Sequence, residues 1–232
     1  MRTVVACESG KKRRVVWMRV YGLTFGTCLW VVAVSLLASE ANPQGGISPV
    51  AGHITALVPR DTVERERQAI PAAKNMELLW LDVVKTDRAG RMRIELADGS
   101  LLSLSSDAQL QIVEHDTRRQ KTFLQLLYGR LLATANHIRK SGGEFEVNTP
   151  TAVVGVVGTK FGVKADPAST DVLCKEGAVR VRNADPNVAG EVVVRAGEFT
   201  HVERGKAPTP PAPASAERIR AGEDATAIPN SP

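Results

Sequence analysis

The sequence predicts an all-β domain of stacked short hairpins, forming a sandwich or a solenoid-like roll, preceded by one N-terminal hydrophobic helix. Between residues 50 and 206, short runs that alternate apolar and polar side chains are separated by turn residues at regular spacing. No long run in this region has helical periodicity, which favours short strands. The helix is predicted because residues 20–38 contain no charged side chain.

The N-terminal segment is typical of a membrane-targeting region. Residues 1–19 hold six of the 30 Lys and Arg residues and only one of the 25 acidic residues. The uncharged run 20–38 would span about 28 Å as a helix, close to the thickness of a hydrocarbon core. Basic residues before an apolar run place the N-terminus in the cytoplasm and the following chain outside. The run is either a retained inner-membrane anchor or the core of a signal peptide, since Ser39 and Ala41 fit a cleavage site before Asn42.

Charge outside this segment argues against a nucleic-acid partner. The first 19 residues account for the whole net charge of +5, so the remaining chain is balanced. A nucleic-acid-binding domain needs surplus cations on its own surface to displace counterions. Cys174 is the only cysteine after residue 28, so no disulfide within the exported chain is expected. Its alternating sequence context predicts a buried packing role.

Composition also predicts the segments that flank the β domain. Residues 39–49 are rich in Pro, Gly and polar side chains, which is typical of a linker. Residues 207–232 hold six of the 13 prolines, and this Pro/Ala-rich tail is predicted to be disordered or extended. One short helix is expected at 61–69, with an Asp or Thr cap, ending before Pro71.

The strands of the β domain follow from alternation and turn signals. Residues 91–96 and 101–105 flank Asp98-Gly99, and an Asp-Gly pair between two such runs is a strong hairpin signal. Further strands are expected at 110–114, 121–129, 130–135, 144–147, 170–175, 178–182, 191–195 and 199–203.

The stretch "NTPTAVVGVVGTKFGV", residues 148–163, contains glycines within an apolar, largely β-branched run. A phosphate-binding loop needs four residues between its glycines, then Lys and Ser or Thr at the start of a helix. Only two residues separate Gly155 from Gly158, and the following sequence is typical of a strand. We therefore expect these glycines to let strands bend and pack closely, with Pro150 at the start or edge of a strand.

The same stretch resembles the signature of the FecR-domain family, a family of bacterial envelope proteins. The matching residues are Val147, Thr149, Pro150, Ala152, Val156, Gly158, Thr159, Phe161 and Val163. The resemblance extends over about residues 50–206, through Asp98-Gly99, Glu176-Gly177 and Gly197-Glu198. One departure is Val157, where the family usually has an arginine, so any contact that this arginine makes would be lost here.

No pattern in the sequence predicts catalysis, a metal site or a cofactor. The four histidines, at positions 53, 115, 137 and 201, stand alone and not at the spacing of metal ligands. A nucleophile motif of the GxSxG type is also missing from the sequence. Glycan recognition would use exposed aromatic side chains, for which Trp80 and Tyr128 are the candidates.

Two polar loops predict a possible anionic-ligand patch. The segments "EHDTRRQK" and "HIRKSGG" lie between expected strands and could place their cations on a shared face. The alternative is that these are ordinary solvated hairpin loops. The patch would consist of Arg118, Arg119, Lys121, Arg139 and Lys140.

The resemblance implies a non-enzymatic envelope protein that acts as a binding, scaffold or signalling module with an envelope or inner-membrane protein partner. It would be periplasmic, anchored through residues 20–38 if these are uncleaved, or secreted. A first alternative is a membrane-anchored regulator in a sigma-factor-type pathway. About 19 cytoplasmic residues are too few to form a core of their own, which argues against direct sigma-factor binding. A second alternative is a cell-wall glycan-binding module.

Overall fold

The computed structural model describes residues 49–58 and 60–228, and the account of the structure is confined to them. The N-terminal hydrophobic helix predicted at 20–38, the basic segment 1–19 and nearly all of the linker 39–49 lie outside the described residues. Within the described part, no helix combines the length and the apolar character needed to cross a membrane.

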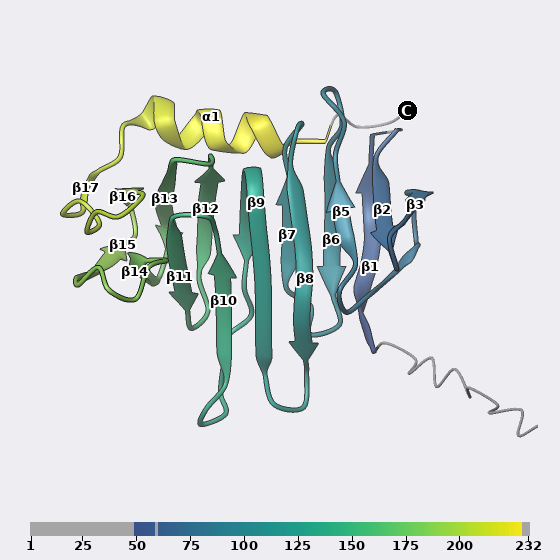
Figure 1. Cartoon of the computed structure of the whole chain (residues 1–232), viewed down its shortest axis with the longest axis horizontal. Helices are drawn as coiled ribbons and strands as arrows, with labels where there is room; N and C mark the ends of the chain where they lie inside the picture. The colour runs from purple at the N-terminus through teal and green to yellow at the C-terminus, as the bar shows by residue number, and fades with distance from the viewer. Residues whose placement is uncertain (1–48, 59, 229–232) are drawn as a thin grey trace, which may run out of the picture. The chain divides into compact units, whose positions relative to one another are not determined.

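The described chain is predominantly β, as the sequence predicts, and its strands form two layers (Figure 1). Layer 1 consists, in spatial order, of β4 (Glu77–Leu79), β1 (Val50–Leu57), β6 (Met92–Leu96), β7 (Leu101–Leu104), β9 (Lys121–Thr134), β12 (Lys160–Ala165), β13 (Ser169–Glu176), β16 (Glu198–Glu203) and β17 (Ala212–Pro213). Layer 2 consists of β3 (Gln68–Pro71), β2 (Thr62–Arg65), β5 (Val83–Lys85), β8 (Gln109–Asp116), β9, β10 (Glu144–Asn148), β11 (Ala152–Val156), β14 (Ala178–Asn183) and β15 (Glu191–Arg195). Neighbours are antiparallel except β9 and β10, which are parallel.

Strand β9 joins the two layers. Its first half pairs with β8 and β10 in layer 2, and its second half, from Gly129, pairs with β7 and β12 in layer 1. Gly129 has a φ of 97°, and a side chain there would overlap Ala108. The sequence predicted two strands, 121–129 and 130–135, but they form one strand that crosses between layers because glycine permits the sharp bend.

The core lies between the layers. Apolar side chains of alternate residues point inward, and one continuous buried cluster extends from Ala51 to Val202. Phe145 of β10 meets Phe161 of β12 edge-to-face, with ring centroids 6.3 Å apart. The two layers therefore pack face to face as a sandwich.

Glycine corners carry the chain from one layer to the other. The chain changes layer between β11 and β12, between β13 and β14, and between β15 and β16. These corners contain Gly158, Gly177 and Gly197, with φ angles of 117°, 83° and 83°. The corners also stack, since the amide of Ala196 donates to the carbonyl of Gly177 at 3.1 Å. This repeated crossing gives the C-terminal half a solenoid-like character.

The prediction of a short helix at 61–69 is wrong, because these residues form the β2–β3 hairpin. Glu66 and Arg67 make the two-residue turn with φ angles of 51° and 67°. Val63 on β2 is fully buried in the core. Packing of this side chain outweighs the helix propensity of a short charged segment.

The tail at 207–232, predicted to be disordered or extended, is ordered over the described residues, with an extended segment followed by a helix. The chain pairs with β16 as β17 and then forms α1 (Ala216–Thr226), which lies across layer 1 (Figure 1). The Ser215 hydroxyl caps the helix by accepting from the amide of Arg218 at 3.2 Å. A cap and contacts with the sheet therefore order a segment whose composition alone suggested disorder.

Candidate functional site

The two loops that carry the predicted cations lie side by side. They connect β8 to β9 and β9 to β10, and Gln120 ties them together. Its Oε1 accepts from the amides of Arg139 at 3.0 Å and Lys140 at 2.8 Å. The Lys140 ammonium donates to the carbonyl of Arg118. We call this surface the basic loop end, and it consists of Arg118, Arg119, Lys121, Arg139 and Lys140.

The basic loop end carries more cations than acids. Its arginines and Lys140 are exposed, and the nearby carboxylates on the same strands are Asp116 and Glu144. Backbone hydrogen bonds from the amides of Arg119 and Arg118, together with the charges of both arginines, lower the pKa of Asp116. Asp116 is therefore ionised at neutral pH and shapes the loop, while an excess of positive charge remains.

A cavity of about 410 Å³ lies against the basic loop end, and it is lined by Arg139 and by Gln120, which connects the two loops. Its walls combine amide, carboxylate and imidazole groups with apolar side chains. The remaining lining residues are Asp98, Thr122, Asn136, His137, Ile138, Glu144 and Phe145. This mixture suits a small polar ligand or a polar side chain of a partner, because the polar groups offer directional hydrogen bonds.

His115 is buried behind this cavity, with only 3% of its surface exposed. Its Nδ1 lies 2.9 Å from the Thr122 hydroxyl, and its Nε2 has no hydrogen-bond partner within the described chain. The nearest carboxylate oxygen, Oδ1 of Asp98, is 3.9 Å from Nε2. Burial lowers the pKa of His115, against the smaller opposing effect of Asp98 and Asp116, so the neutral imidazole is favoured.

The Asp98-Gly99 turn holds one wall of the cavity in place. The Asp98 carboxylate accepts from the amide of Ser100 at 2.8 Å and from its hydroxyl at 2.9 Å. The Ser100 hydroxyl in turn accepts from the amide of Asn136 at 3.0 Å. The predicted hairpin turn between β6 and β7 therefore also positions the start of the second basic loop.

The 148–163 stretch builds the scaffold beside this site. The Thr149 hydroxyl accepts from the amide of Ala152 at 2.8 Å and lies 2.8 Å from the hydroxyl of Thr170. Pro150 lies in the turn between β10 and β11. The Thr159 hydroxyl donates to the carbonyl of Ala178 at 3.1 Å, which ties two glycine corners together.

Gly158 is the point where this stretch meets the cavity wall. A Cβ atom at Gly158 would lie 2.5 Å from Nδ1 and 2.8 Å from Cα of His137. The neighbouring Val157, in place of the family arginine, is exposed at the corner. At the corner between β15 and β16, which contains Gly197, the Glu198 carboxylate accepts from the amide of Arg195 at 2.8 Å.

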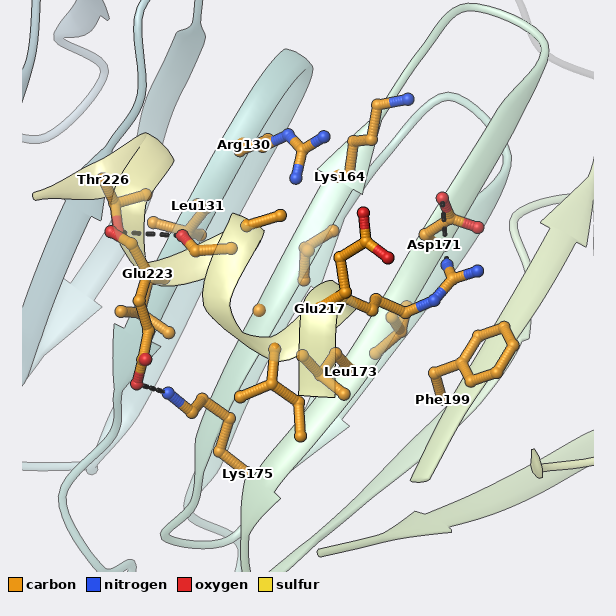
Figure 2. A pocket seen from close by; sticks show the side chains of 18 of the residues that line it. Arg130, Leu131, Lys164, Asp171, Leu173, Lys175, Phe199, Glu217, Glu223 and Thr226 are labelled. Carbon is orange, nitrogen blue, oxygen red and sulfur yellow. Dashed lines mark hydrogen bonds and ion pairs between the residues drawn. The ribbon is translucent and has the colours of Figure 1, made fainter. Parts of the chain in front are cut away.

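A second cavity of about 360 Å³ lies between α1 and the outer face of layer 1 (Figure 2). The guanidinium of Arg218 stacks 4.0 Å from the ring centre of Phe199 and pairs with Asp171 at 3.9 Å. Lys175 and Glu223 form a further ion pair across the cavity edge. This cavity was not predicted because helix α1, which covers it, was not predicted. Ser215 directly before a run of helix-forming residues is an N-cap signal that could have indicated the helix.

The remaining candidates for chemistry lie in separate places. Trp80 is half-buried, and its Nε1 donates to the carbonyl of His115 at 3.1 Å, whereas Tyr128 is exposed. His201 pairs with Asp171 at 2.7 Å on layer 1. Among residues 49–58 and 60–228, no three His, Cys, Asp or Glu side chains gather as they would around a metal ion.

Comparison with known proteins finds a matching family model and solved structures that are similar over part of the chain. A family model described as FecR protein matches residues 82–180. Two crystal structures of a "putative anti-sigma factor" from Parabacteroides distasonis, at 1.65 and 2.50 Å resolution, are similar with 20% and 19% identity and TM-scores of 0.49. Each match covers 60% of this chain and 63% or 62% of the other chain, so the likeness spans less than two thirds of that protein. A search of the curated proteins found no match.

Proposed function

We propose that this chain, whose residues 82–180 match the FecR protein family model, is a non-enzymatic binding module of transmembrane signalling in the bacterial envelope. The observation that carries the proposal is the position of the basic loop end. Both of its loops and every residue that lines the cavity beside it lie inside the matched segment. The part of the chain that is similar to the family therefore builds the surface best suited to contact a partner.

The basic loop end would recognise an acidic group on that partner. Exposed guanidinium and ammonium groups form charge-assisted hydrogen bonds with carboxylates or phosphates. Gln120 in the first loop accepts from two backbone amides of the second loop, so the loops are already held together before a partner binds. Binding therefore loses less conformational entropy. The neighbouring cavity would accept a polar side chain of the same partner. No bond is made or broken in this role.

The proposed location is the periplasm, with attachment to the inner membrane if residues 20–38 are retained. The basic segment followed by an uncharged run supports export of the β domain. A regulator of a sigma-factor-type pathway would act here through an inner-membrane protein.

In-cell photo-crosslinking with mass spectrometry tests the proposal. A photoreactive amino acid at Arg139 in the full chain should capture an envelope or inner-membrane protein. The matched control is Gln68, which is exposed on the edge strand β3. Capture of the same proteins from both positions, or of none from position 139, would count against a partner at the basic loop end.

The competing function, cell-wall glycan binding, has a separate readout. A glycan-binding module should sediment with purified peptidoglycan, and Tyr128→Ala should weaken this retention because sugars pack against exposed aromatic rings. We expect the full chain to stay in the supernatant. Retention that depends on Tyr128 would replace the signalling proposal with the glycan-binding one.

A further inference from the structure

The edges of the two layers differ in how well they are protected from pairing with another chain. Among the described strands, the edges are β4 and β17 in layer 1 and β3 and β15 in layer 2. β3 and β17 end in proline, and β4 has three residues. Proline and short length are common protections of an edge. Strand β15, "EVVVR", has five residues and neither protection.

The free side of β15 exposes backbone groups that can pair. The amide of Arg195 points to this free side, where the Glu198 carboxylate of the same chain accepts from it at 2.8 Å, so a second strand must displace Glu198 in order to pair at Arg195. Because backbone groups alternate in direction along a strand, the amides and carbonyls of Val193 and Glu191 also point away from β14. Val193 is 40% exposed and projects on the outer face with both charged residues, whereas Val194 is buried in the core.

The charges of β15 are self-complementary about Val193. Glu191 and Arg195 lie two residues before and two residues after it. In an antiparallel pair centred on Val193, each Glu191 faces the Arg195 of the other copy, and the two valines face each other. Neither Glu191 nor Arg195 forms an ion pair within the described chain. If residues 191 and 195 carried charges of the same sign, two copies of the strand would instead repel each other.

We propose that β15 is a homodimerisation edge, where layer 2 of one molecule continues into layer 2 of a second copy through a two-fold antiparallel pair. The occupant is the same chain because the complementarity lies within a single five-residue strand. The pair is small compared with the interfaces of stable dimers, so the association is weak and depends on concentration. Attachment to a membrane would favour it by raising the local concentration. This inference does not depend on the proposed function.

Charge reversal tests the register. The full chain in mild detergent should form dimers as its concentration rises, measured by light scattering. Glu191→Arg and Arg195→Glu should each weaken dimerisation about tenfold, because each places two like-charged pairs across the axis. The double variant restores opposite charges and should return to within about threefold of the original affinity. A chain that stays monomeric at every concentration would overturn the proposal. A double variant no better than either single variant would overturn it too.

Cysteine crosslinking tests the position of the axis. Val193→Cys, in a full chain with Cys7 and Cys28 replaced by serine, should form a covalent dimer with a short bismaleimide. Facing residues in such a pair have Cα atoms about 5.5 Å apart, so their thiols are within its reach. The control is Val113→Cys, since Val113 is 38% exposed but lies on β8 inside layer 2. Equal crosslinking of the two variants, or none from position 193, would contradict the two-fold pair.

Discussion

Replacing Gly158 with valine probes the corner that joins the FecR-like motif to the cavity wall. The backbone at Gly158 has a φ of 117°, which side chains other than glycine rarely adopt. Forcing an L-residue into left-handed geometry costs about 1–2 kcal/mol. The added Cβ would also lie 2.8 Å from the Cα of His137, and such overpacking costs about 1–3 kcal/mol. Together these predict a loss of about 2–5 kcal/mol in the free energy of unfolding.

Thermal and urea denaturation of the full chain measure this loss. For a domain of this size, a loss of about 1 kcal/mol lowers the melting temperature by about 2–4 °C, so we expect a decrease of about 4–20 °C. Gly155→Val is the control, because Gly155 lies in the same motif and has open space where a Cβ would be. Its unfolding free energy should change by less than about 1 kcal/mol. Adding His137→Ala to Gly158→Val should recover only part of the loss, because the His137 Cα and the backbone strain remain. Equal melting temperatures for Gly158→Val and Gly155→Val would refute this reasoning.

Three further predictions concern the site and the core. Gln120→Ala should speed hydrogen exchange at the amides of Arg139 and Lys140, because both amides lose their shared acceptor. The same variant should lower the free energy of unfolding by about 1 kcal/mol. Unchanged exchange would show that Gln120 does not order the loops. Burial lowers the pKa of His115 from 6.5, so below about pH 6.5 the unfolded chain binds a proton that the folded chain excludes, and stability falls with pH down to the lowered pKa. His115→Gln should remove this part of the decline in denaturation curves, and an unchanged pH profile would contradict it. Burial raises the pKa of Cys174 to about 11, so iodoacetamide should label this thiol only after denaturation, and labelling of Cys174 itself in the native chain, located by peptide mass spectrometry, would contradict this prediction.

Local signals in the sequence predicted the elements that depend on local chemistry. The Asp98-Gly99 pair forms a turn between two strands as expected, because Gly99 has a φ of 81° and the Asp98 carboxylate accepts from the amide of Ser100. Alternation likewise identified most strands after residue 90. Strands β1 to β5 were not predicted, because they are short or interrupted.

Elements that depend on tertiary contacts were not predictable in the same way. Gly129 marks a turn in the sequence, but the structure uses it to bend one continuous strand between layers. Glu66 and Arg67 have helix-forming side chains, yet they make a tight hairpin because Val63 packs into the core. Helix α1 depends on a sheet face that is formed by residues distant in sequence.

The candidate site was foreseen in part. The sequence indicated that the cations of two polar loops could share a face, and these loops do lie side by side. Binding of an anionic group there stays a prediction. The cavity and His115 were not foreseen, because the approach of His115 to Asp98 depends on the pairing of four strands. A lone histidine in a sequence carries no sign of its burial.

The most direct test of the functional account is the side of the membrane on which the β domain resides. Fusions of the full chain at its C-terminus to alkaline phosphatase and to a cytoplasmic fluorescent reporter give opposite readouts in living cells. The account predicts an active phosphatase fusion and a dark fluorescent fusion, because residues 1–38 deliver the domain to the periplasm. A fluorescent fusion with inactive phosphatase would place the domain in the cytosol and contradict an envelope binding module.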